Sequence, residues 1–398
     1  MGKPTFDVAR ARRDTPGCTR VLHFNNAGAA LMPTPVVESL IAHLQLEASV
    51  GGYEAAELAH AAAERAYDAI AALIGCQRDE VAVIENATRA WDLAFYSIPF
   101  QAGDRILTCV AEYGSNYIAL LQVARRSGAQ VEVIPNDEHG QVSLDTLDRM
   151  LERPARLIAI THIPTNGGLV NPVAEVGRFA RDAGVLYLLD SCQAVGQMPL
   201  NVDTIGCDML SATGRKYLRG PRGTGFLYVR RQVLERIEPV FLDLHSARWT
   251  ASDAYRVRSD ARRFENWESY VAGKIGLGVA VDYAMSWGLE SIAARIQSLA
   301  DSLRRGLAEI PRVRVHDQGA VKCGIVSFTV EGMDCKLIQQ ALARHHMNVS
   351  VSTVEATRLD MEARRLESLV RASVHYYNTE EEVERFCDAV ARISRRAG

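Results

Sequence analysis

The stretch "VLYLLDS" (185–191) decides the fold class. It is a short apolar run that follows Gly184 and ends in a carboxylate, Asp190. Such a run is typical of a strand that is buried on both faces of a sheet. A carboxylate at its end is costly unless a partner compensates it. Asp190 is therefore either a capping residue of a loop or the counter-charge of a buried cation.

Similar strands alternate with helical segments through the middle of the chain. We predict strands at 105–110, 130–137, 156–164, 208–214 and 223–231, and helices at 117–129, 143–151 and 172–184. This alternation predicts an α/β fold with a mostly parallel sheet sandwiched by helices. From about residue 275 the pattern predicts a smaller C-terminal α+β domain, with a helix at 365–371 and a strand at 372–378. We predict an N-terminal segment 1–20, a large domain 21–270 and a small domain 271–398.

The second informative stretch is "SATGRKYLRG" (211–220), which contains Lys216. Only five of the 45 basic residues are lysines. A guanidinium stays protonated, whereas a lysine that is buried or near other cations can lose its proton and act as a nucleophile. Lys216 is thus either a solvated loop cation or a nucleophile paired with Asp190, because both residues follow strands of the same predicted sheet.

The cations between 215 and 222 leave a competing hypothesis, a non-catalytic phosphate- or nucleic-acid-binding protein. The net charge of −3 and the sequence pI of about 6.4 disfavour nucleic acid. No GxGxxG or GxxxxGK[ST] motif occurs. The stretch "ENATRAW" (85–91) is either a plain capped helix or a helix start whose N–H groups bind phosphate.

The bulk composition limits the cellular setting. The eight cysteines include no CxxC pair, which fits a reducing cytoplasm and disfavours a zinc ribbon. The first residues lack the apolar region of a signal peptide, and no apolar run approaches the ~18 residues of a membrane span. We predict a cytoplasmic protein with no metal site and no nucleic-acid or membrane partner.

Several motifs together resemble one family. They are "FNNAGAALMP", "NATRA", "AEYGSN", "HIPTNGGLVNP", "DSCQAVG", "GRKYLRGPRGTGFLYV", "FENWE" and "VRASVHYYNTEEEV". The chain resembles the fold-type-I pyridoxal 5'-phosphate (PLP) enzymes, and more narrowly the class V aminotransferase family. That family includes cysteine desulfurases, selenocysteine lyases and isopenicillin-N-epimerase-like enzymes. The resemblance implies a PLP cofactor, an amino-acid substrate and a homodimer with active sites at the interface.

The resemblance also implies a role for each matched residue. Lys216 would form the internal aldimine and move the Cα proton, and Asp190 would pair with the pyridinium nitrogen. The remaining cofactor contacts would come from Ala87, Thr88, Thr213, Gln193, Tyr113 and Asn166, and from Ser269 of a partner chain, beside Glu268. The substrate would be bound by Asn166, Ala27, Gly28 and the carboxylate-binding Arg371, which is otherwise a surface arginine.

Three positions depart from the desulfurase pattern. Arg215 replaces a common histidine, and Gly114 replaces the aromatic residue that stacks on the cofactor, so that either Tyr113 stacks or the site is more open. Residues 349–370 contain no cysteine, which disfavours a persulfide-forming desulfurase. We therefore expect an enzyme acting at the Cα of an amino acid, first an aminotransferase. A cysteine-independent C–S β-lyase and an epimerase are the alternatives.

Overall fold

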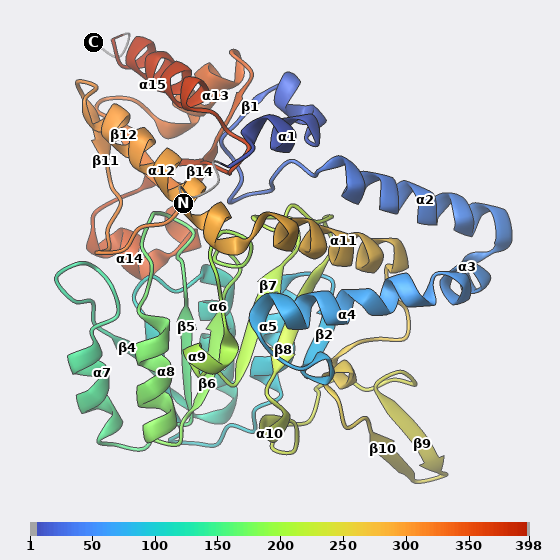
Figure 1. Cartoon of the computed structure of the whole chain (residues 1–398). Coiled ribbons are helices and arrows are strands. Elements are labelled where there is room, and N and C mark those ends of the chain that lie inside the picture. The colour runs from blue at the N-terminus through green and yellow to red at the C-terminus, as the bar shows by residue number, and fades with distance from the viewer. Residues whose placement is uncertain (1–5, 396–398) are drawn as a thin grey trace, which may run out of the picture.

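The computed structural model describes residues 6–395 and is built on a seven-stranded sheet (Figure 1). Its strand order is β2 (Val81–Ile84), β8 (Gly225–Val229), β7 (Met209–Thr213), β6 (Leu186–Asp190), β5 (Leu157–Thr161), β3 (Arg105–Cys109) and β4 (Gln130–Ile134). In this sheet β8 alone runs opposite to the other six strands. The predicted α/β class with a mostly parallel sheet is confirmed.

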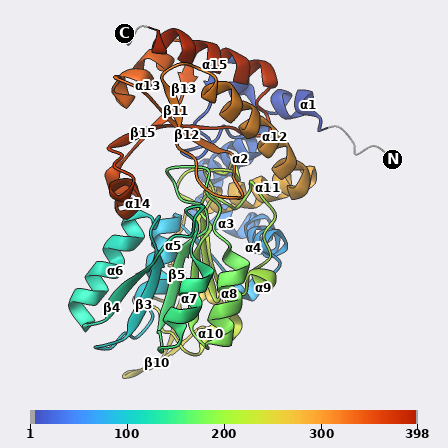
Figure 2. The same ribbon diagram turned by 90° about the vertical axis from the view of Figure 1, so that its left-hand side faces the viewer.

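Both faces of the central strands β5, β6, β7 and β8 are buried, which is why these strands are almost wholly apolar. Leu186 and Leu188 of β6 share a buried cluster with α5 (Ala87–Tyr96) and α6 (Gly114–Ser127). Tyr187 and Leu189 point to the opposite face, which is covered by α7 (Leu144–Leu151) and α8 (Val173–Asp182). Figure 2 shows the sheet between α6 and α8.

A smaller antiparallel sheet lies in the C-terminal part. Its order is β11 (Val313–Val315), β12 (Ile325–Val330), β15 (Ser368–Ser373) and β14 (Ser350–Thr353). The helices α12 (Leu289–Ala308) and α13 (Cys335–Ala343) pack against it, and α15 (Glu380–Ser394) packs on both of these helices. The helix predicted at 365–371 and the strand at 372–378 are wrong. This segment forms β15, because it pairs with β12 on one side and β14 on the other.

The two parts are joined by the N-terminal segment and by two helices. α11 (Val271–Trp287) packs on α2 (Thr34–Val50) and α4 (His60–Ile74), whereas α12 packs on α15. α1 (Val8–Arg13) carries Arg12, whose guanidinium lies 2.8 Å from the carboxylate of Glu382, and β1 (Leu22–His23) pairs with β13 (Met347–Asn348). The division at 20 and 270 stays a prediction, and its residues 1–5 and 396–398 lie outside the described residues.

Short elements complete the chain. They are α3 (Gly52–Leu58), α9 (Val202–Ile205), α10 (Arg231–Leu234), α14 (Arg358–Ala363), the hairpin β9 (Ala247–Ala251) and β10 (Ala254–Val257), and 3-10 turns at Pro16–Thr19, Arg78–Glu80, Ala261–Phe264 and Val354–Ala356. Within residues 6–395, the helices are too short or too polar to span a bilayer.

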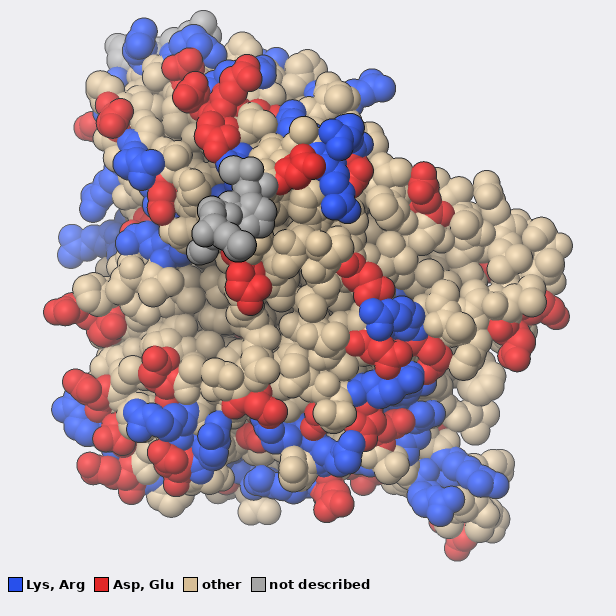
Figure 3. Space-filling view, in the orientation of Figure 1, with Lys and Arg blue, Asp and Glu red and all other residues tan. Residues whose placement is uncertain are grey.

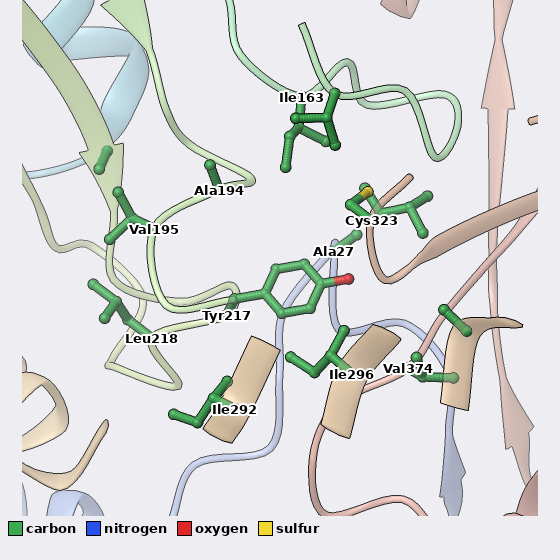
Figure 4. Close-up of a cluster of buried hydrophobic side chains, with 14 of the residues drawn as sticks. Ala27, Ile163, Ala194, Val195, Tyr217, Leu218, Ile292, Ile296, Cys323 and Val374 are labelled. Atoms are coloured by element: carbon green, nitrogen blue, oxygen red, sulfur yellow. The ribbon is translucent and has the colours of Figure 1, made fainter. Parts of the chain in front are cut away.

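The residue after Lys216 lies where the two parts meet. The ring of Tyr217 is buried in a cluster of apolar side chains from both parts (Figure 4). Its labelled neighbours are Ala27, Ile163, Ala194, Val195, Leu218, Ile292, Ile296, Cys323 and Val374. Packing of this ring on both parts holds the loop that follows β7.

Helix α15 offers a test of local stability. Thr379 caps it: its side chain accepts a hydrogen bond from the amide of Glu382, whose carboxylate accepts one from the amide of Thr379. Thr379→Ala should lower the free energy of unfolding by about 1 kcal/mol, because an N-terminal amide loses its partner. Urea denaturation measures this, and Thr379→Ser is the control that keeps the cap. Equal stability of the alanine variant and the wild type would refute the role of the cap.

Candidate active site

A cavity of roughly 200 Å³ lies at the carboxyl ends of the central parallel strands. This edge of an α/β sheet is where ligands usually bind. The cavity is lined by Asn86, Ala87, Thr88, Tyr113, Asn116, Thr161, Ile163, Thr165, Asp190, Cys192, Gln193, Thr213, Arg215 and Lys216.

Asp190 is held at the end of β6 by two hydrogen bonds. One carboxylate oxygen accepts from Asn116 Nδ2 at 2.9 Å, and the other accepts from the backbone amide of Cys192 at 2.9 Å. Asn116 belongs to α6, so a helix and the turn after the strand orient one carboxylate together. These donors offset the cost of burying the charge.

A second carboxylate, Glu112, lies behind the first. It accepts from Thr161 Oγ1 at 2.5 Å, from Asn116 Nδ2 at 2.9 Å and from the amide of Tyr113 at 2.9 Å. The pKa of Glu112 is raised to about 7, because burial and the charge of Asp190 together outweigh the three donors, which lower it. The sequence placed Glu112 and Asn116 at a polar strand end but assigned them no role.

Lys216 lies on the loop that follows β7, next to Asp190 at the edge of the neighbouring strand β6. Burial lowers the pKa of the Lys216 ammonium, and the charges of Arg215 and Arg371 lower it further. A larger fraction of Lys216 is therefore the neutral amine, the form that can bond to an aldehyde or take up a proton.

The start of α5 offers the cavity an anion site. Asn86 caps α5 by accepting a hydrogen bond from the amide of Arg89. Ala87 and Thr88 form the first turn of α5 and line the cavity together with Thr213. The first amides of a helix lack partners within the helix, and with the helix dipole they favour a phosphate group.

The predicted cofactor residue Gln193 lines the cavity. The predicted substrate residues Arg371, Asn166, Ala27 and Gly28 do not line it, but they contact or adjoin residues that do. Arg371 donates from Nη1 to Oγ1 of Thr165 at 2.5 Å and to its carbonyl at 3.0 Å, and Asn166 donates from Nδ2 to Thr357 Oγ1 at 2.5 Å. Gln193 donates from Nε2 to the carbonyl of Ala27 at 3.2 Å. Each of these three side chains keeps one buried polar atom without a partner: Arg371 Nε, Asn166 Oδ1 and Gln193 Oε1.

One predicted residue lines a different pocket. Ser269 lines a separate pocket with Gly223, Thr224 and Lys274, not the cavity that contains Lys216. The resemblance assigns Ser269 to the site of a partner chain, and this stays a prediction. Conversely, five residues for which the sequence predicted no binding role line the cavity: Asn116, Thr161, Thr165, Cys192 and Arg215.

The glycine at position 114 has a steric cause. A Cβ at Gly114 would lie 2.1 Å from the carbonyl oxygen of Glu355, in the 3-10 turn that packs against the start of α6. An aromatic residue at 114 would therefore displace this turn. Tyr113, which lines the cavity, is the aromatic side chain left on this segment to cover a cofactor ring.

The basic cluster 215–222 does not form a surface patch. Arg215 and Lys216 line the cavity, and Arg219 is buried, where it donates to Tyr376 Oη at 2.6 Å and to the carbonyl of Leu31. Only Arg222 is exposed. This arrangement disfavours the competing nucleic-acid hypothesis, because such binding needs several exposed cations.

These groups fit one cofactor. An amine-bearing lysine, a carboxylate at the adjacent strand end and an anion site at a helix N-terminus match the aldehyde, ring nitrogen and phosphate of pyridoxal phosphate. The unpartnered polar atoms of Gln193, Asn166 and Arg371 are further sites for a ligand. Fold and site together define a PLP-dependent enzyme of fold type I.

Comparison with known proteins gives the family. The model of the family "Aminotransferase class-V" matches residues 22–386, and the chain belongs to this PLP-dependent family. A probable cysteine desulfurase of Methanothermobacter thermautotrophicus is 28% identical over 393 residues, covering 96% of this chain and 97% of the relative. The apo structure of a cysteine desulfurase from Thermococcus onnurineus NA1 superposes with a TM-score of 0.92 and 26% identity over 100% of both chains. The structure of C-DES, a cystine C–S lyase bound to its product cysteine persulfide, has a TM-score of 0.84 and 24% identity, covering 95% of this chain and 99% of C-DES.

The raised pKa of Glu112 predicts a pH dependence. In the folded protein this carboxyl keeps its proton up to about pH 7, whereas its ordinary pKa is 4.5. The folded state binds more protons in this window, so its contribution to stability is lost as pH rises. Glu112→Gln should gain stability relative to the wild type by on the order of 2 kcal/mol between about pH 5 and about pH 8. Urea denaturation at both pH values measures this, and a constant difference would refute it.

Proposed function

We propose that the protein is a PLP-dependent C–S β-lyase that cleaves cysteine S-conjugates without a catalytic cysteine. The names of its relatives favour C–S bond cleavage over the aminotransferase expected first from the sequence. The net reaction takes a conjugate and water to pyruvate, ammonia and a thiol. The Cβ–S bond breaks, and the sulfur leaves with the electron pair and takes up a proton.

The proposal of a cysteine-independent reaction rests on the segment 349–370. In the desulfurases a loop before the carboxylate-binding arginine holds the nucleophilic cysteine, but here residues 349–370 contain none. Instead the turn Val354–Ala356 packs against Gly114, and buried Thr357 accepts a hydrogen bond from Asn166. The segment that would have to supply a thiol for persulfide chemistry thus has the hydroxyl of Thr357, which is bound to Asn166.

Cys192 is the one cysteine that lines the cavity, and its environment disfavours a nucleophilic role. Burial raises the pKa of its thiol, although the charge of Lys216 lowers it. The thiolate, not the thiol, attacks sulfur. Cys192 is also fixed in the turn after β6, where its amide donates to Asp190. We assign it to the wall of the cofactor site.

The other site residues would bind either the cofactor or the substrate. Pyridoxal phosphate, when bound, supplies an electron sink for negative charge at the substrate Cα. Asp190 would hold the proton of the ring nitrogen, and α5 with Thr88 and Thr213 would hold the phosphate. Lys216 would take the proton from Cα, and Arg371 would bind the α-carboxylate through donors not used by Thr165.

Lys216→Ala tests the central role. The purified variant should lose the visible absorption of the lysine-bound cofactor, and β-elimination should fall by at least about 10²- to 10⁴-fold, the range for a positioned proton-transfer group. Lys336→Ala, which changes an exposed lysine of α13, is the matched control and should keep both properties. A colourless wild type that PLP does not reconstitute would rule out the proposal.

The products separate the reaction classes. A panel of cysteine S-conjugates incubated with the holoenzyme should yield pyruvate and thiol in equal amounts by mass spectrometry. A keto acid that retains its sulfur, with the amino group left on the enzyme, would instead indicate a transaminase. Racemised substrate would indicate the epimerase.

We further propose a homodimer. Two exposed sets of large apolar side chains support it, on α2–α3 and between residues 240 and 270. Tyr53 and Leu58 are 75% and 70% exposed on the arm that α2 and α3 form, which Figure 3 shows to be largely uncharged. Apolar patches of this kind mark interfaces. We also propose a cytoplasmic setting, because all eight cysteines are free.

The dimer is testable by sedimentation. The wild type should sediment as a dimer, and the double variant Tyr53→Asp/Leu58→Asp should shift toward the monomer, because two charges would be buried in the interface. Leu337→Asp on α13, an exposed leucine away from the arm, is the control. A monomeric wild type at micromolar concentration would contradict the proposal.

A further inference from the structure

Arg215 places a second cation in the substrate part of the cavity. Its Nη1 donates to the carbonyl of Gly28, and its own carbonyl accepts from the amide of Ala30 at 2.9 Å. Within the described residues, the bond to Gly28 is the one hydrogen bond that the Arg215 side chain makes. A guanidinium carries five N–H donors. The side chain lines the cavity with donors to spare.

Arg371 is the first cation of this region, and it is buried. Within residues 6–395, neither Arg371 nor Arg215 forms an ion pair with a carboxylate. The pKa of Arg371 is lowered to about 10, mainly by burial and in part by the charge of Arg215. Because neither arginine has a carboxylate partner, the pair favours a ligand that carries more than one negative charge.

The contact with Gly28 shows which end of the cavity Arg215 faces. Residues 25–30 run beside β15: Asn25 bridges Ser373, and the amide of Ala27 donates to Ser373 Oγ at 2.9 Å. Arg371 lies on β15, two residues before Ser373. Arg215 is thus tied to the loop that borders Arg371, whereas the anion site for the cofactor phosphate lies at the start of α5.

We propose that Arg215 binds a second anionic group, at the far end of the substrate's sulfur substituent. The substrate class is then L-cysteine S-conjugates whose substituent ends in a carboxylate. This inference rests on the proposed function. Arg371 pairs with the α-carboxylate, and Arg215 pairs with the distal one. S-carboxymethyl-L-cysteine and water would yield pyruvate, ammonia and thioglycolate, with the thiolate leaving Cβ and taking up a proton.

An isosteric pair of substrates tests this on the holoenzyme. S-carbamoylmethyl-L-cysteine has the shape of S-carboxymethyl-L-cysteine but lacks the distal charge. The wild type should prefer the acid in kcat/KM by about 10- to 100-fold, the range for a hydrogen bond to a charged group. Arg215→Gln should bring this ratio close to one, mainly through KM. Arg215→Lys should keep part of it, and Arg222→Gln, an exposed arginine nearby, should keep all of it.

A second pair separates failure of this inference from failure of the lyase proposal. L-2-aminoadipate replaces the sulfur of S-carboxymethyl-L-cysteine by a methylene, so it binds but has no C–S bond to break. Its Kd, read from the visible spectrum of the cofactor, should be about 10- to 100-fold lower than that of its side-chain amide, and Arg215→Gln should remove this difference.

Each other outcome identifies a specific error. If no conjugate releases pyruvate but aminoadipate still binds better than its amide, the lyase proposal fails and Arg215 keeps its role. If the wild type treats acid and amide alike, the inference is overturned. It is also overturned if Arg215→Gln weakens both members equally, as a second ligand of the α-carboxylate or a clamp on Gly28 would. Loss of cofactor affinity in Arg215→Gln without a change in the ratio would make Arg215 a phosphate ligand instead.

Discussion

The carboxylate of Asp190 ends a strand that is buried on both faces, and much of the site is arranged around the cost of placing a charge there. Asn116 and the turn amide of Cys192 supply the donors, and Thr161 lies directly opposite in the register with β5. The same register brings β7, and hence the loop of Lys216, to this edge of the sheet. A cationic ring nitrogen would complete the compensation that the hydrogen bonds begin.

The sequence predicted the central elements well because burial on both faces leaves a local signature. The strand at 185–191 and the helices at 143–151 and 172–184 are predicted from neighbouring residues, and they form as β6, α7 and α8. The helix predicted at 365–371 rests on a local preference alone. Pairing with β12 and β14 overrides that local preference and places Arg371 inside a strand.

The contacts that shape the cavity could not be read from the sequence, because they join distant residues. The hydrogen bond of Arg215 to Gly28, and that of Asn166 to Thr357, link loops more than a hundred residues apart. The turn that excludes a side chain at Gly114 belongs to the C-terminal part. Where desulfurases place a histidine before the lysine and a cysteine on the opposite segment, this chain has Arg215 and a cysteine-free segment. Under the proposed function, the first change would serve recognition of the leaving group, and the second would remove the thiol that persulfide chemistry needs.

The claim at the centre is that sulfur leaves with the substrate's own substituent and never bonds to the protein. Intact-protein mass spectrometry of the holoenzyme, quenched during turnover of the thioether S-carboxymethyl-L-cysteine, tests this most directly. We predict that the mass of the chain stays that of the unmodified protein, while pyruvate and a sulfur-bearing product accumulate in solution. A gain of one sulfur atom, mapped by peptide analysis to Cys192 or another cysteine, would contradict it.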